Sequence, residues 1–315
     1  MKEKSPNFFV VGVVKGGTTS LYQYLSQHPD VFLTPIKETN HFSDKDMDHE
    51  HFDNQYELDS RLDIKKYLAK KERETVHIAH VRERSDYMKL FQNVGNERAR
   101  GEVCNSYMLC PCSASQIYEA FPDSKIIVML REPARRMYSQ YLMNIREAKV
   151  LGRSFREEIE HDNNKNRKGW GVSHNYFELG NYASQIKRYI ELFGKENVMV
   201  CLFEDFIKDP EKEMKRIFKF LDVSEDVKLD TQVFNVARKP RSKYLNYFLS
   251  RTGILKLARS IVPKAKRGKY KQMLSKKGGF VPISAEDEAY LRAHYASEVK
   301  DLKALLNIDL NIWGY

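Results

Sequence analysis

The sequence predicts an α/β fold in a single domain, with a central, mostly parallel sheet flanked by helices. Three short runs rich in β-branched and aromatic residues are typical of strands buried on both faces, at residues 8–14, 125–130 and 197–203. Each run lies next to a segment whose apolar residues have helical spacing. Such alternation of strands and helices favours a parallel sheet.

The first of these units reads as a strand, a glycine loop and a helix. The run Phe-Phe-Val-Val-Gly-Val-Val at 8–14 is followed by Lys15-Gly16-Gly17-Thr18-Thr19-Ser20 and then by apolar residues at helical spacing. A glycine loop in this position presents backbone N–H groups and the positive end of a helix to an anion. We therefore expect phosphate to bind at this P-loop-like segment.

The later units repeat the pattern. The strand at 125–130 ends at Arg131-Glu132-Pro133, and a proline suits the first turn of the helix that we expect next. An amphipathic helix over 182–193 precedes the strand at 197–203, and another helix is predicted over 286–306. Two polar stretches, 43–63 and 152–175, are expected to be loops or insertions within one domain that spans 1–315.

The composition excludes several classes of protein. Of the 315 residues, 42% are hydrophobic and 12% aromatic, which supplies enough apolar surface for a core and argues against disorder. No run approaches the roughly 18 to 20 apolar residues of a membrane span, and we expect neither a signal peptide nor an anchor. The four cysteines are too few for a disulfide framework, so we expect a cytoplasmic protein.

The net charge of +10 comes from one segment. Residues 231–285 contain 14 Lys and Arg but no Asp or Glu, which leaves 39 basic and 43 acidic residues elsewhere. This excess predicts an anionic partner, and a nucleic acid, a membrane surface or a phosphorylated small molecule would each fit. Residues 249–273 mix apolar and basic side chains as a membrane-surface segment does, but we favour a segment that covers the active site.

Two functions stay open at this point, that of a P-loop kinase and that of a nucleic-acid-binding protein. A P-loop kinase requires the pattern G-x-x-x-x-G-K-[ST], whereas here Thr18 follows Gly17 and the lysine lies inside the loop as Lys15. A nucleic-acid-binding protein is supported by the charge alone, because no helix-turn-helix, zinc-finger or RNP pattern is present.

Two motifs in matching order resemble sulfotransferases that use 3′-phosphoadenosine-5′-phosphosulfate (PAPS). The segment at 10–21 resembles the family's 5′-phosphosulfate loop, and Arg131 with Ser139 eight residues later resembles its 3′-phosphate motif. Further similarity lies at 180–183, 203–206 and 235–243. The resemblance covers essentially the whole chain and is nearer to the glycosaminoglycan and bacterial branch. It implies PAPS as donor, adenosine-3′,5′-bisphosphate (PAP) as product, and a hydroxyl or nitrogen as acceptor.

The resemblance also implies roles for the matched residues. The 5′ end of the donor would be held by the loop, which consists of Lys15, Gly16, Gly17, Thr18, Thr19 and Ser20. Within it, Lys15 would lie beside the bridging oxygen where charge develops. Arg131 and Ser139 would bind the 3′-phosphate, unless Arg131 only forms a surface ion pair with Glu132 or a nearby acid. Arg238, Lys239 and Arg241 resemble the basic loop that closes over this phosphate.

The base of the glycosaminoglycan branch is a glutamate in a Lys-Glu-x-x-His/Phe-Phe context. The sequence Pro-Ile-Lys-Glu-Thr-Asn-His-Phe at 35–42 matches at Glu38, which we expect to take the proton of the acceptor. His41 is the second candidate, because a histidine titrates near neutral pH. His77 and His80 are weaker candidates, since nothing in the sequence places them near the loop.

We expect no metal. The pattern Asp44-x-Asp46-x-Asp48 hints at a calcium loop, but the sixth position is His49 rather than glycine and the twelfth is a glutamine. The three cysteines at 104, 110 and 112 lack the paired spacing and the fourth ligand of a zinc site. Because the acidic stretch follows Glu38 directly, we expect a polar or cationic acceptor, a small molecule or a sugar, rather than a sulfated one.

Overall fold

The structure of the chain is a computed structural model that describes residues 4–147, 149–231, 238–240, 275–277 and 282–315. Its central sheet has five parallel strands in the order β2-β5-β1-β6-β7, which confirms the predicted α/β fold. The strands are β1 (Phe8–Val10), β2 (Val31–Leu33), β5 (Ala99–Val103), β6 (Lys125–Leu130) and β7 (Val198–Leu202).

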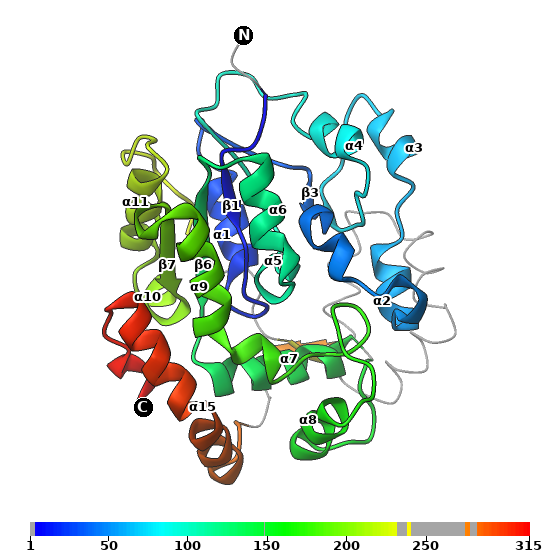
Figure 1. Cartoon of the computed structure of the whole chain (residues 1–315), viewed down its shortest axis with the longest axis vertical. Coiled ribbons are helices and arrows are strands. Elements are labelled where there is room, and N and C mark those ends of the chain that lie inside the picture. Colours follow the sequence, from blue (N-terminus) through cyan, green and yellow to red (C-terminus); the bar gives the residue numbers. More distant parts are fainter. Residues whose placement is uncertain (1–3, 148, 232–237, 241–274, 278–281) are drawn as a thin grey trace.

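Helices cover both faces of the sheet (Figure 1). One face packs against α1 (Thr18–Leu25), α10 (Phe203–Lys208) and α11 (Pro210–Phe220). The other packs against α6 (Cys112–Ala120), α7 (Pro133–Arg146), α9 (Tyr182–Phe193) and α15 (Ala285–Leu306). Alternate residues of one strand enter the two cores, since Phe8 and Val10 face the first set of helices and Phe9 faces the second.

Two small sheets and several short helices complete the described part of the chain. In one sheet β3 (Ile36–Glu38) runs parallel to β4 (Val76–Ile78), and in the other β8 (Arg238–Pro240) runs antiparallel to β9 (Ser275–Lys277). The remaining helices are α2 (Asn54–Ser60), α3 (Ile64–Leu68), α4 (Arg84–Lys89), α5 (Ser106–Leu109) and α8 (Phe155–Asn163). Short 3-10 turns are η1 (His41–Asp46), η2 (His49–His51), η3 (Glu178–Gly180), η4 (Lys195–Asn197) and η5 (Asn311–Trp313).

The structure differs from the sequence prediction in the two polar stretches. They were expected to be loops or insertions, and each contains a helix, α2 in the first and α8 in the second. Asp53 caps α2, and Ser154 and Glu157 form a reciprocal capping box at the start of α8. Of the two alternatives, a plain loop is excluded for the residues of α2 and α8, because helix caps can begin a helix in a strongly polar segment.

The predicted strand at 8–14 is shorter in the structure. β1 ends at Val10, although the backbone N–H groups of Val11 and Val13 still donate to carbonyls of β6 at 3.0 and 2.9 Å.

Among the residues that the structure describes, no helix has both the length and the apolar character needed to cross a membrane.

Candidate active site

A cavity of about 940 Å³ lies where the loops after the central strands meet. Lys15 follows β1, Asn105 follows β5, and Arg131 follows β6, and all three line the cavity. Parallel strands bring their carboxyl ends to one edge of a sheet, which is where ligands of such folds bind. Residues of the two polar stretches also line the cavity, among them Asp53 and Trp170.

The glycine loop connects β1 to the first turn of α1. Gly17 has a φ of 99°, and a Cβ atom there would lie 2.8 Å from the ring of Phe203. A Cβ atom at Gly16 would lie 2.5 Å from the carbonyl oxygen of Met129. The loop therefore needs glycine at both positions. Its other members, Lys15, Thr18, Thr19 and Ser20, line the cavity together with Gly17, whereas Gly16 does not.

Lys15 is a buried cation among other cations. Burial, followed by repulsion from Arg146, Arg131 and Lys37 that is partly offset by Glu147, lowers the pKa of Lys15 to about 8. Such a group gains from an incoming anion, because a bound phosphate would relieve the repulsion between the cations. The site is thus electrostatically prepared for a ligand of high negative charge.

Arg131 and Ser139 both line this cavity, as the two-motif prediction requires. The guanidinium of Arg131 lies 4.5 Å from the centre of the Phe203 ring, and its Nη1 donates to the carbonyl oxygen of Lys15 at 3.3 Å. The carboxylate of Glu132 instead caps α7 by accepting the N–H groups of Ala134 and Arg135. Glu132 thus acts as a helix cap, while the carboxylate of Glu204 is the acid with the larger electrostatic effect on Arg131. The assignment of Arg131 to the 3′-phosphate stays a prediction.

Glu38 ends β3, lines the cavity and is 5% exposed. Its Oε1 accepts from Lys37 Nζ at 2.9 Å and from Asn105 Nδ2 at 2.7 Å, and His77 Nε2 lies 4.0 Å away. Burial raises its pKa, but the charges of Lys37 and His77 and the two hydrogen bonds outweigh burial and hold the pKa below its usual value. Glu38 is therefore ionised near neutral pH, as a proton acceptor must be.

Asn105 joins the glycine loop to Glu38. Its Oδ1 accepts from Thr18 Oγ1 at 3.2 Å, while its Nδ2 donates to Glu38. The side chain is 7% exposed, so both hydrogen bonds are shielded from water. This amide fixes the distance between the anion-binding loop and the carboxylate, and sequence reasoning had not identified it.

The three histidines considered as candidate bases, His41, His77 and His80, take different positions. The ring of His41 stacks on Tyr87 with centroids 4.3 Å apart, its Nδ1 pairs with the carbonyl oxygen of Val81 at 2.7 Å, and it does not line the cavity. Burial lowers the pKa of His41. His77, one of the weaker candidates, lines the cavity beside Glu38 because β4 pairs with β3. His80 lies near Asp44 and His49 instead.

The basic segment is described only in part. Arg238 and Lys239 belong to β8, which lies next to α7, the helix that carries Ser139. Arg241 lies outside the described residues. The assignment of these three residues to the 3′-phosphate stays a prediction.

Comparison with known proteins identifies the family of the chain. The sequence model of the sulfotransferase family matches residues 6–226, which include the glycine loop, Glu38, Arg131 and Ser139. The chain belongs to the sulfotransferase family. The solved structure of a sulfotransferase from Alicyclobacillus acidocaldarius superimposes with a TM-score of 0.73 at 30% identity, covering 99% of both chains.

Curated sulfotransferases show more distant similarity. Carbohydrate sulfotransferase 15 of Mus musculus is 25% identical over 69% of this chain and 44% of its own length. Heparan sulfate glucosamine 3-O-sulfotransferase 6 of Homo sapiens is 24% identical over 75% of this chain and 58% of its own length. The chain thus spans about half the length of the curated relatives that it matches.

Proposed function

We propose that this sulfotransferase moves the sulfuryl group of PAPS to a hydroxyl or nitrogen of a polar acceptor by in-line displacement. The observation that carries the proposal is the convergence of Lys15, Arg131 with Ser139, and Glu38 on one cavity. Two anion-binding elements and an ionised carboxylate are what a donor with charge at both ends and an acceptor with a proton to lose require.

The donor would lie across the two cationic elements. PAPS carries about four negative charges, two at the 3′-phosphate and two at the phosphosulfate. The 3′-phosphate would contact Arg131 and Ser139, and the 5′-phosphate would contact the amides of residues 16–20. This placement puts the bridging oxygen near Lys15, whose positive charge stabilises the negative charge that develops on that oxygen.

The reaction would need no metal and no covalent intermediate. As Glu38 takes the proton of the acceptor, the acceptor oxygen or nitrogen attacks the sulfur atom from the side opposite to the leaving phosphate. The bond between sulfur and the bridging oxygen breaks, and its electron pair stays on the phosphate of PAP beside Lys15. The contacts of Glu38 that the structure describes all fall on Oε1, which leaves Oε2 to meet the acceptor.

We further propose that the acceptor is a polar small molecule or a sugar, neutral or cationic. The part of the wall that comes from residues 43–63 consists of Asp53, Tyr56 and Asp59, two carboxylates and one aromatic ring. Residues 152–175 add Trp170 and side chains of both signs to the same wall. A polyanionic acceptor would meet repulsion from the two carboxylates.

Transfer from labelled PAPS to a panel of acceptors tests this proposal. The panel comprises neutral sugars, amino sugars, small alcohols and amines, and sulfated polysaccharides, with Arg131→Ala as the control that has lost donor binding. We expect label to appear on neutral or cationic acceptors with the wild-type chain only. Preference for sulfated polysaccharides would contradict the acceptor class, and transfer of the γ-phosphate of ATP would favour a kinase.

The expected cytoplasmic location stays a prediction.

A further inference from the structure

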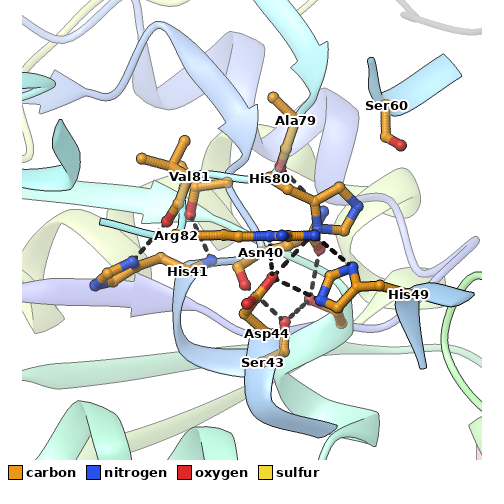
Figure 2. A network of polar contacts seen from close by, with 12 residues as sticks. Asn40, His41, Ser43, Asp44, His49, Ser60, Ala79, His80, Val81 and Arg82 are labelled. Carbon is orange, nitrogen blue, oxygen red and sulfur yellow. Dashed lines mark hydrogen bonds and ion pairs between the residues drawn. The ribbon is translucent and has the colours of Figure 1, made fainter. Parts of the chain in front are cut away.

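A second group of polar side chains lies next to Tyr56, one of the residues that line the cavity. Asp44 in η1, His49 at the start of η2 and His80 just after β4 point toward one another (Figure 2). They come from three separate segments of the chain, and one potential ligand atom from each lies within 4.8 Å of the other two. None of the three lines the cavity that holds Glu38.

Asp44 forms ion-pair contacts with His49, His80 and Arg82, but several polar atoms of the cluster have no hydrogen bond. His49 Nε2 lies 3.1 Å and His80 Nδ1 3.7 Å from Asp44 Oδ1, but neither contact has the geometry of a hydrogen bond. Among the described residues, Asp44 Oδ1, His49 Nε2 and both ring nitrogens of His80 are buried atoms without a hydrogen-bond partner. Asp44 Oδ1, His49 Nε2 and His80 Nδ1 face one another, and because buried polar atoms are normally hydrogen-bonded, these three atoms have the capacity for one further partner.

Two of the three separations in the cluster are close to those of a tetrahedral metal site, and the third is at most 4.8 Å. Zinc binds histidine nitrogen and carboxylate oxygen at about 2.1 Å, so two ligand atoms of a tetrahedral site lie about 3.4 Å apart. The two separations measured from Asp44 Oδ1, 3.1 and 3.7 Å, lie on either side of that value. Two histidines and one carboxylate, with water as fourth ligand, form a donor set that zinc commonly uses.

We propose that Asp44, His49 and His80 form a binding site for a divalent transition metal ion, with zinc as the best fit. Calcium is disfavoured because it prefers six to eight oxygen ligands. The sequence analysis set aside a calcium loop at Asp44, Asp46 and Asp48 and expected no metal, whereas the structure brings two histidines to Asp44. One of these, His80, lies 36 positions along the chain from Asp44.

Arg82 competes with the metal for this site. Its Nη2 donates to His49 Nδ1 at 2.8 Å, and its Nε lies 3.5 Å from Asp44 Oδ1. In a neutral ring that accepts at Nδ1, the proton is on Nε2, so Nε2 cannot bind a metal until Arg82 withdraws and the proton moves to Nδ1. The Arg82 side chain is 57% exposed, so it can turn into solvent at little cost.

A metal here would stabilise the wall of the acceptor cavity. The ring of His80 stacks on Phe52, with centroids 5.2 Å apart, and lies 5.8 Å from the ring of Tyr56, which lines the cavity. An ion held by Asp44, His49 and His80 would cross-link η1, η2 and the end of β4. Its role is structural, because the chemistry of transfer is carried by Glu38 and the donor loop.

Zinc titration of the metal-free chain by calorimetry, without PAPS, tests the site independently of the proposed function. We expect one ion per chain. Asp44→Asn and His80→Ala should each weaken binding by at least about tenfold, since even outer partners of metal ligands are worth about 10- to 100-fold. The matched control is His51→Ala, two positions from His49, whose ring pairs with Asp48 and lies outside the cluster; it should bind as wild type does.

Arg82→Gln gives a result that misfolding cannot imitate. Removal of the competing cation should tighten zinc binding, and Co²⁺ added in place of zinc should give the visible absorption of a tetrahedral site. Zinc that does not bind to the wild-type chain at equimolar concentration would overturn the proposal. So would unchanged binding to Asp44→Asn and His80→Ala, binding lost equally in His51→Ala, or weaker binding to Arg82→Gln.

Discussion

Glu38→Gln is expected to abolish sulfuryl transfer while leaving the affinity for PAP near that of the wild type. The amide keeps an oxygen that can accept from Lys37 and Asn105, but it cannot take a proton from the acceptor. General bases contribute roughly 10²- to 10⁴-fold to a rate, so kcat should fall by at least about 100-fold. Initial rates with saturating PAPS, together with PAP binding by calorimetry, measure the two quantities.

Two further variants make this result interpretable. Glu119→Gln applies the same chemical change at an exposed position on α6 and should leave the rate unchanged. His41→Ala should retain the pH dependence and most of the rate of a folded enzyme, because its ring packs on Tyr87 away from the cavity. If Glu38→Gln turned over normally while His41→Ala was folded but inactive, the base would be His41.

Lys15→Ala is expected to lower kcat by at least about tenfold. The lysine provides a charge-assisted contact to the leaving phosphate that strengthens as the bond to sulfur breaks. Steady-state kinetics with varied PAPS measure the loss. Lys66→Ala, which changes a lysine whose side chain is 86% exposed, is the matched control. An unchanged kcat for Lys15→Ala would remove the glycine loop from the transition state.

The lowered pKa of Lys15 also predicts a pH profile. Below pH 8 the free enzyme holds Lys15 protonated, and above it the cation is lost, so kcat/KM for PAPS should fall as the pH rises through about 8. Bound donor favours the cation, so the fall in kcat should lie at higher pH. In Lys15→Arg any remaining activity should lack this fall. A wild-type kcat/KM that stays level across this range would contradict the assignment.

The sequence predicted β1, β6 and β7, whose residues are almost all apolar, but not β2, an apolar strand of only three residues. It did not predict β5, where Gly101 and Glu102 are fully enclosed in the sheet. A Cβ atom at Gly101 would lie 2.5 Å from the Phe8 ring. Glu102 is 0% exposed, contacts Thr39 Oγ1 at 3.1 Å, and has a pKa raised to about 7 by burial. Charged and small residues in a strand acquire partners only in the tertiary fold, so periodicity cannot identify them.

In the candidate site, too, some residues could be identified from the sequence and others only from the tertiary fold. Lys15, Glu38, Arg131 and Ser139 could be named from motifs, and the structure brings all four to one cavity. Asn105, which ties the loop to the carboxylate, has no sequence signature because its role depends on where β5 ends beside β1 and β3. The cluster of Asp44, His49 and His80 likewise depends on the pairing of β3 with β4.

Selective binding of PAP tests the central claim most directly. Thermal unfolding is measured with PAP, with ATP and magnesium, and with DNA or RNA, for the wild type and for Arg131→Ala. A ligand at 100 times its Kd adds about 2.7 kcal/mol to the stability of the protein that binds it. We expect PAP alone to stabilise the wild type, and its effect to be largely lost in Arg131→Ala. Stabilisation by ATP with magnesium or by nucleic acid, and none by PAP, would contradict the account.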